Sequence, residues 1–224
     1  MQPKLELLFF HGKPASGKDA QAAKLAAEFP DCGIISGVFR SAFTSTGQFA
    51  KYHDIVAPHI LPLGKGIDIP GVTIAELLRN IISDNIETGK RALIVCGLLR
   101  TPSHLIETQK WLSYQREHEI ASNHIYFVTT DEECLSRAKN RLKEHEKEGL
   151  ARQDDAENLL KARLSRWHQN TKPMLNILFG EGKLNIIKAN RMPLEVYKDT
   201  LKLVDCLGVR HRIEGFSLPV ELIR

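Results

Sequence analysis

A short run of glycines and lysines near the start of the chain has the spacing that chemistry on phosphate groups requires. Residues 12–18 read GKPASGK and fit the pattern G-x-x-x-x-G-K. The glycines let the backbone curl so that successive N–H groups face a polyphosphate, and Lys18 can reach the phosphoryl group that is transferred. The predicted nucleotide contacts of this segment are Gly12, Lys13, Pro14, Ala15, Ser16, Gly17, Lys18, Asp19 and Ala20.

The residues on either side supply the structural context that this pattern needs. Residues 5–10 form an apolar stretch that predicts a buried strand, and residues 18–28 have helical periodicity. The dipole of a helix that begins at Lys18 adds positive potential at the loop. An ordinary glycine-rich turn is the alternative, but the order strand, glycines, lysine and helix favours a phosphate-binding loop.

The position after the loop lysine is unusual. Many loops of this kind have Ser or Thr there, with the hydroxyl on Mg²⁺, whereas this chain has Asp19. The carboxylate could contact Mg²⁺ from a new direction, or it could cap the helix and point away from the nucleotide. Both interpretations stay open at this point.

Transfer between two phosphorylated molecules also needs several convergent cations, because it brings many negative charges into one cleft. Arg137 and Arg141 are four residues apart and therefore share one face of a predicted helix. Any single arginine is more often a solvated surface residue, so the argument depends on the set. The candidates are Arg40, Arg100, Arg137, Arg141, Arg152 and Arg163.

The elements that must position these residues follow an alternating pattern. Short apolar runs that predict strands are separated by longer stretches with helical periodicity, which is typical of an α/β fold with a parallel sheet and helices on both faces. The predicted strands are 5–10, 33–35, 91–95, 124–129 and 184–187. The predicted helices are 18–28, 73–88, 102–117, 131–148, 155–179 and 193–206.

Composition narrows the class of protein. A chain of 224 residues with 42% hydrophobic content can bury one sizeable core, and 31 basic against 27 acidic residues do not suggest a nucleic-acid or membrane partner. Four cysteines without a CxxC pair, and an opening without a secretory leader, indicate reduced thiols in a cytoplasmic protein. Residues 43–70 are rich in Gly and Pro and predict an insertion outside the sheet, and residues 143–153 predict a charged excursion.

Over residues 5–204 the sequence resembles adenylate kinases. Residues 12–21 are similar to the phosphate loop of that family, and Ser36-Gly37 with Arg40 is similar to its monophosphate-binding turn. Residues 66–70 resemble the segment that closes the monophosphate-binding insertion, and residues 95–101 resemble the DGFPRT motif, whose arginine here is Arg100. The arginines that frame the family's lid correspond to Arg137, Arg141, Arg152 and Arg163.

The resemblance implies a fold and a domain organisation. The fold is the P-loop NTPase three-layer sandwich, with a central five-stranded parallel sheet. The core would comprise residues 1–35, 71–141 and 153–207, with a nucleoside monophosphate-binding insertion at about 36–70. A short, metal-free lid would span about 142–152, and residues 208–224 would be a tail of unknown role.

It also implies an activity, namely reversible, Mg²⁺-dependent transfer of the ATP γ-phosphoryl group to a nucleoside monophosphate by a monomeric enzyme. The loop would hold ATP, and Arg137 would pack against its base. The acceptor site would comprise Ser36, Gly37, Arg40, Gly97, Arg100 and His104. The residues that act on the migrating group would be Lys18, Arg100, Arg141, Arg152 and Arg163.

Asp19 departs from the family pattern, which has Gly at that position, and three further positions depart from it as well. Cys96 stands where DGFPRT has its aspartate, Val38 follows the Ser36-Gly37 turn in place of an acidic residue, and His104 replaces the glutamine that reads adenine. Two alternatives therefore remain: a nucleotide-binding protein of the same fold with little activity, and a P-loop kinase for another small metabolite.

Overall fold

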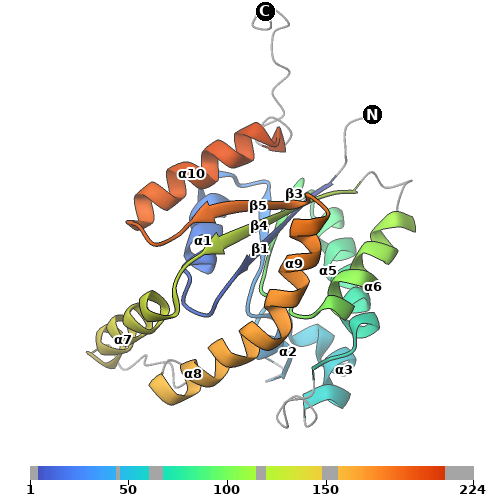
Figure 1. Ribbon diagram of the computed structural model, residues 1–224. Helices are drawn as coiled ribbons and strands as arrows, with labels where there is room; N and C mark the ends of the chain where they lie inside the picture. Colours follow the sequence, from blue (N-terminus) through green and yellow to red (C-terminus); the bar gives the residue numbers. More distant parts are fainter. Residues whose placement is uncertain (1–4, 44–45, 61–67, 115–119, 148–155, 210–224) are drawn as a thin grey trace, which may run out of the picture.

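The computed structural model describes residues 5–43, 46–60, 68–114, 120–147 and 156–209 (Figure 1). Its centre is an all-parallel sheet of five strands in the order β2-β3-β1-β4-β5. The strands are β1 (Leu5–Gly12), β2 (Cys32–Ile35), β3 (Ala92–Cys96), β4 (Ile120–Val128) and β5 (Leu184–Lys188). The predicted fold class is confirmed, and each strand overlaps a run predicted from the sequence.

Strand β4 begins four residues earlier than the apolar pattern predicted. Residues 120–123 pair with residues 5–8 of β1, and Asn123 donates a hydrogen bond of 3.3 Å to the buried Glu6. This start of the strand includes Ser122 and Asn123, so no continuous apolar run marks it. Pairing with a central neighbour, and not hydrophobicity, extends the strand.

Helices cover both faces of the sheet, as Figure 1 shows. On one side lie α1 (Lys18–Glu28) and α10 (Pro193–Cys206), and on the other lie α5 (Gly71–Glu87), α6 (Pro102–Tyr114) and α9 (Lys172–Gly180). Side chains of β1 alternate between the two cores: Leu8 and Phe10 face α1 and α10, whereas Leu7 and Phe9 face the other layer. The expected three-layer sandwich follows from this alternation.

The remaining helices stand apart from these layers. Short helices α2 (Val38–Phe43), η1 (Ala50–Tyr52), α3 (His53–Val56) and η2 (Ala57–His59) occupy the region between β2 and α5. Helices α7 (Asp131–Lys147) and α8 (Glu157–Arg166) extend away from the sheet (Figure 1). The helix predicted for residues 155–179 is divided, because the π-helix η5 (Trp167–Thr171) joins α8 to α9.

The predicted insertion and lid are described only in part. Helix α7 continues to Lys147, so the first residues of the predicted lid are helical, and residues 148–152 lie outside the described residues. Residues 61–67 of the predicted insertion and the tail from residue 210 also lie outside them. The domain boundaries therefore stay predictions.

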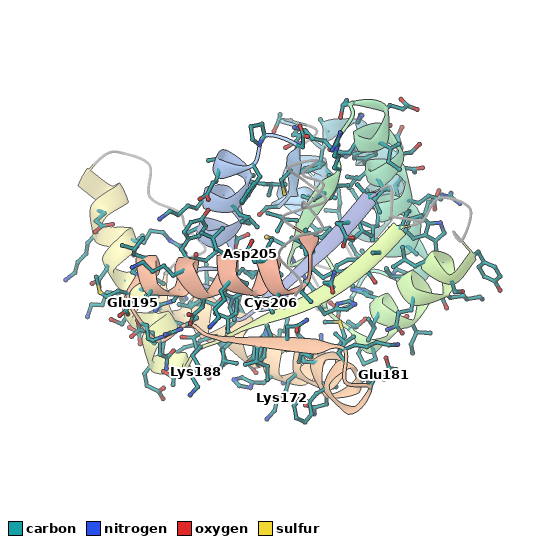
Figure 2. All side chains as sticks on the ribbon, turned by 90° about the horizontal axis from the view of Figure 1, so that it is seen from above. Lys172, Glu181, Lys188, Glu195, Asp205 and Cys206 are labelled. Atoms are coloured by element: carbon teal, nitrogen blue, oxygen red, sulfur yellow. The ribbon has the colours of Figure 1, made fainter. Side chains whose placement is uncertain are left out.

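The view from above shows α10 running beside the sheet, with Glu195 near its start and Asp205 and Cys206 at its end (Figure 2). All four cysteines are free; Cys206 is exposed and the other three are buried. Among the described helices, none is both long enough and apolar enough to cross a membrane.

Candidate active site

The loop between β1 and α1 has the backbone form that its sequence predicts. Gly17 has a φ of 92°, a left-handed conformation that glycine adopts at little cost, and it is the N-cap of α1. The Ser16 N–H donates to the Lys13 carbonyl oxygen at 3.1 Å, which closes the turn. The loop therefore leads into a helix N-terminus whose first N–H groups have no partner within the helix.

The two lysines of the loop point in different directions. The Lys18 side chain passes close to the loop after β3, because a Cβ atom added to Gly97 would lie 3.6 Å from Lys18 Cε. At the end of the side chain, Lys18 Nζ lies 3.0 Å from Asp19 Oδ2. Lys13 Nζ instead lies 2.5 Å from Asp131 Oδ1 and 5.6 Å from the centre of the Trp167 ring. Lys18 is thus the cleft lysine, and Lys13 ties the loop to α7.

Asp19 faces the cleft. Its Oδ1 accepts a hydrogen bond of 2.7 Å from Ser36 Oγ, and its side chain is 56% exposed. Partial burial favours a higher pKa for Asp19, but Lys18 and the Ser36 hydroxyl outweigh it and hold the pKa below the ordinary value. Asp19 is therefore ionised at neutral pH, next to the loop lysine and the predicted monophosphate-binding turn.

The charge of Asp19 also reaches Cys96. Burial first, and the neighbouring Asp19 carboxylate second, raise the pKa of the Cys96 thiol, so this residue is a neutral thiol. A carboxylate on α1 consequently lies close to the β3 position where the DGFPRT pattern has its aspartate. Sequence alone left the direction of the Asp19 side chain open.

The Arg100 side chain is held in place by the loop after β3 and by an aromatic ring of α2. Its Nε donates to the Gly97 carbonyl oxygen at 3.0 Å, and its guanidinium carbon lies 4.7 Å from the centre of the Phe39 ring. Withdrawal from water at the cleft floor, followed by the like charge of Arg163, lowers the pKa of Arg100 to about 10, although its outer surface stays accessible. Arg100 remains charged at neutral pH, with the carboxylate of Asp68 as an opposing charge nearby, and its guanidinium can bind an anion.

A cavity of about 530 Å³ brings most of the predicted site residues together. The loop after β1, the start of α1, the loops after β2 and β3, and helices α7 and α8 all contribute to its wall. The predicted residues that line it are Pro14, Ala15, Lys18, Asp19, Ser36, Gly37, Gly97, Arg100, Arg141 and Arg163. Donor and acceptor candidates thus share one space.

Several predicted residues lie elsewhere or are not described. Ala20 is exposed in the first turn of α1, Arg40 belongs to α2 but its side chain is not described, and Arg152 lies outside the described residues.

Arg137 donates to Glu133 Oε1 at 2.7 Å, to the Ser16 carbonyl oxygen at 3.0 Å and to the Ala189 carbonyl oxygen at 2.6 Å. These bonds fix the plane of its guanidinium beside the loop.

His104 does not line this cavity. Its side chain is buried, with Nδ1 bonded to the Arg100 N–H and Nε2 to the Ile69 carbonyl oxygen. The expected contact with an acceptor base does not fit this arrangement, because both ring nitrogens are occupied by backbone groups.

Sequence reasoning missed a group of residues around a second, smaller hollow of about 160 Å³ that shares Lys18, Arg100 and Arg163 with the first. Arg166 contributes to its wall and lies three residues after Arg163 on α8, a spacing that could have identified it. Asp68 and Asn170 also line it, and Asn170 Nδ2 donates to Asp68 Oδ2 at 2.5 Å. No sequence signal marked this pair.

A buried histidine pair adjoins the same hollow. His11 Nε2 lies 2.9 Å from His124 Nδ1, and the two rings are stacked. Burial lowers the pKa of both, that of His124 to about 4, so the pair is neutral at physiological pH.

The described residues contain no cluster of three or more His, Cys, Asp or Glu side chains suited to a metal ion.

Fold and site together define a P-loop NTPase, because the glycine-rich loop joins the central strand of a parallel sheet to a helix N-terminus. A family model described as an AAA domain matches residues 7–174, and the chain belongs to this family.

Three relatives of this chain are named as kinases that act on nucleoside monophosphates. The chain is 25% identical to uridylate kinase of Saccharomyces cerevisiae over 88% of this chain and 89% of the relative. It is 24% identical to UMP-CMP kinase of Sus scrofa, over 93% and 100% of the two chains, and 26% identical to adenylate kinase of Lodderomyces elongisporus, over 88% and 82%. The resemblance to nucleoside monophosphate kinases that the motifs indicated is thereby confirmed.

Proposed function

We propose that this protein is a kinase that transfers the ATP γ-phosphoryl group to a nucleoside monophosphate. The observation that carries the proposal is the shared cavity in which Lys18, Arg100, Arg141 and Arg163 approach one space from four different elements. Phosphoryl transfer is catalysed mainly by positioning and by charge stabilisation, and both need such convergent cations.

The residues divide into a donor side and an acceptor side. The loop N–H groups and Lys18 hold the phosphates of ATP, and the fixed plane of Arg137 packs against its base. On the acceptor side, Arg100 binds the monophosphate beside the Ser36-Gly37 turn, with Arg40 as a further candidate. Arg141 and Arg163, with Arg152, neutralise charge on the migrating group.

Asp19 and Ser36 would help to hold the Mg²⁺ that accompanies ATP. An ionised carboxylate and a hydroxyl, both on the cavity wall, are hard oxygen ligands that suit Mg²⁺ directly or through its water shell. When bound, the ion neutralises phosphate charge during transfer. We propose that Asp19 thereby takes over from the aspartate that Cys96 has replaced.

Exchanging the two side chains tests this relocation. Asp19→Gly is expected to raise the Mg²⁺ concentration for half-maximal rate about tenfold or more, because a carboxylate near the ion is lost. The double variant Asp19→Gly, Cys96→Asp is expected to recover most of that loss. Cys96→Asp alone is expected to slow the reaction, because it buries a second negative charge beside Asp19.

Steady-state rates across a Mg²⁺ titration measure these effects. Ser36→Ala is the matched control for the hydrogen bond that orients the carboxylate, and it is expected to give a smaller shift in the same direction. An unchanged Mg²⁺ dependence in Asp19→Gly would show that this carboxylate only orients Lys18.

For the acceptor, we propose a pyrimidine nucleoside monophosphate. Two of the three relatives above are named for UMP, CMP or uridylate, and this chain lacks the glutamine that pairs with adenine in adenylate kinases. A missing paired contact with a base costs orders of magnitude in discrimination. We therefore expect kcat/KM for UMP or CMP to exceed that for AMP by about 10²-fold or more.

Coupled detection of ADP, with Mg²⁺-ATP and each of AMP, GMP, CMP, UMP, dTMP and the deoxy forms, measures this preference. A clear preference for AMP would overturn the pyrimidine assignment but leave the kinase. If ATP binds and no monophosphate is turned over, the protein is a nucleotide-binding member of the fold or a kinase for another metabolite.

A further inference from the structure

The short segment that precedes α5 is attached to the core through a histidine. The Ile69 carbonyl oxygen lies 2.7 Å from His104 Nε2, and a carbonyl can only accept, so Nε2 carries the proton. His104 Nδ1 then has a lone pair, and it accepts the backbone N–H of Arg100 at 3.1 Å. One neutral imidazole therefore bridges Ile69 and Arg100 with both nitrogens.

A second contact attaches the same segment to η5. Asp68 accepts a hydrogen bond from Asn170, and the next residue, Thr171, donates from Oγ1 to the Arg100 carbonyl oxygen at 3.1 Å. The peptide groups on both sides of Arg100 are thus used, its N–H by His104 and its carbonyl by Thr171. The position of Arg100 depends on where the segment and η5 lie.

We propose that His104 is a positioning residue that couples the Asp68–Ile69 segment, at the end of the predicted acceptor-binding insertion, to the phosphate-binding Arg100. The inference rests on the proposed function for the role of Arg100. It assigns His104 a role in arranging the acceptor site and not in reading the acceptor base.

The coupling should be lost at acid pH, because only the neutral ring can accept a hydrogen bond from the Arg100 N–H. A protonated Nδ1 would place a second donor against that N–H, so the contact with Arg100 would be lost. Burial, first, and the positive charge of Arg100 lower the pKa of His104 below 6.5, whereas the hydrogen bond to Ile69 and the charge of Asp68 oppose that shift. The bridge is therefore intact at neutral pH and is lost as the pH falls below the His104 pKa.

Two amide variants separate the two halves of the bridge. His104→Gln keeps a donor near the Nε2 position and retains the bond to Ile69, whereas His104→Asn keeps an acceptor near Nδ1 and cannot reach Ile69. We expect the Asn variant to raise the acceptor KM about tenfold, with kcat and the KM for ATP changed less than about threefold. The Gln variant is expected to raise the acceptor KM by a smaller factor, about threefold, because it keeps the contact with Ile69 and loses only the one with the Arg100 N–H.

Measuring the acceptor KM against pH adds a signature that packing alone would not give. In the wild type the acceptor KM is expected to rise as the pH falls below the His104 pKa and to level off near the value of His104→Gln, which has lost the same contact with Arg100. In both amide variants this rise at acid pH should be absent. His168→Asn is the matched control, since His168 is exposed and bonded to Asp131 on the other side of the site. His168→Asn should therefore keep the rise of the acceptor KM at acid pH.

Amide hydrogen exchange tests the coupling without any substrate. The Arg100 N–H is expected to be protected in the wild type and in His104→Asn, and to exchange faster in His104→Gln. Faster exchange in residues 53–60 of His104→Asn would show that release of Ile69 loosens the insertion. Unchanged exchange and an unchanged acceptor KM in both variants would overturn the coupling and leave the proposed kinase intact. If the Arg100 N–H exchanges as expected in the two variants but no monophosphate is turned over, the coupling is supported and the proposed kinase function is rejected.

Discussion

Lys18→Met is expected to lower the rate of phosphoryl transfer about 10³-fold or more and to change the affinity for ATP much less. The ammonium group lies at the cleft face of the loop, beside Asp19 and Gly97, where it can follow charge that develops on the migrating group. Methionine retains most of the chain volume, so the fold should persist. Single-turnover rates at saturating ATP and acceptor measure the effect on chemistry directly.

Lys13→Met is the matched control, because it removes a lysine from the same loop. The Lys13 ammonium is bound to Asp131 and faces away from the cavity, so we expect the transfer rate to stay within about fivefold of wild type, with a small loss of stability. Equal losses in the two variants would mean that the loop needs both charges for its shape. Full activity of Lys18→Met would refute the phosphate-loop assignment.

Strands β1 and β3 were predictable because they are buried on both faces of the sheet. The sequences of such strands are almost entirely apolar, and residues 5–10, interrupted only by Glu6, and 92–95 are examples. The start of β4 was missed because Ser122 and Asn123 interrupt that pattern. The π-helix at 167–171 was also missed, since it lies directly between α8 and α9 and no Gly or Pro separates it from α8.

Spacing predicted the residues of the cavity better than their orientations. Lys18, Arg100 and Arg163 belong to local patterns, and they line one space because the ends of parallel strands meet at one edge of the sheet. The partners of His104 and Asp19 are set by distant segments: Ile69 lies 35 residues before His104, and Ser36 lies 17 residues after Asp19. No local pattern determines such a choice of hydrogen-bond partner.

Neutralising Arg141 or Arg163 is the other change for which we expect a large effect. Arg141→Gln and Arg163→Gln should each lower kcat by about 10²- to 10⁴-fold, because a cation that meets the migrating phosphoryl group stabilises mainly the transition state. The side chains come from α7 and α8 and line the same cavity, and Arg163 also acts electrostatically on Arg100. Arg163→Gln is therefore expected to raise the acceptor KM as well, whereas Arg141→Gln should act on kcat alone.

Arg91→Gln provides the control for loss of a positive charge. Arg91 precedes β3, at the opposite end of that strand from Arg100, and its Nε lies 3.8 Å from Asp31 Oδ2. We expect Arg91→Gln to change kcat less than twofold, because a surface charge at the far end of β3 from the cavity is screened by solvent and salt. If Arg141 and Arg163 act as one unit with Arg152, the triple variant should lose little more than the worst single variant. Changes of twofold or less at Arg141 and at Arg163 would make them surface residues and leave Arg100 and Lys18 as the cations of the reaction.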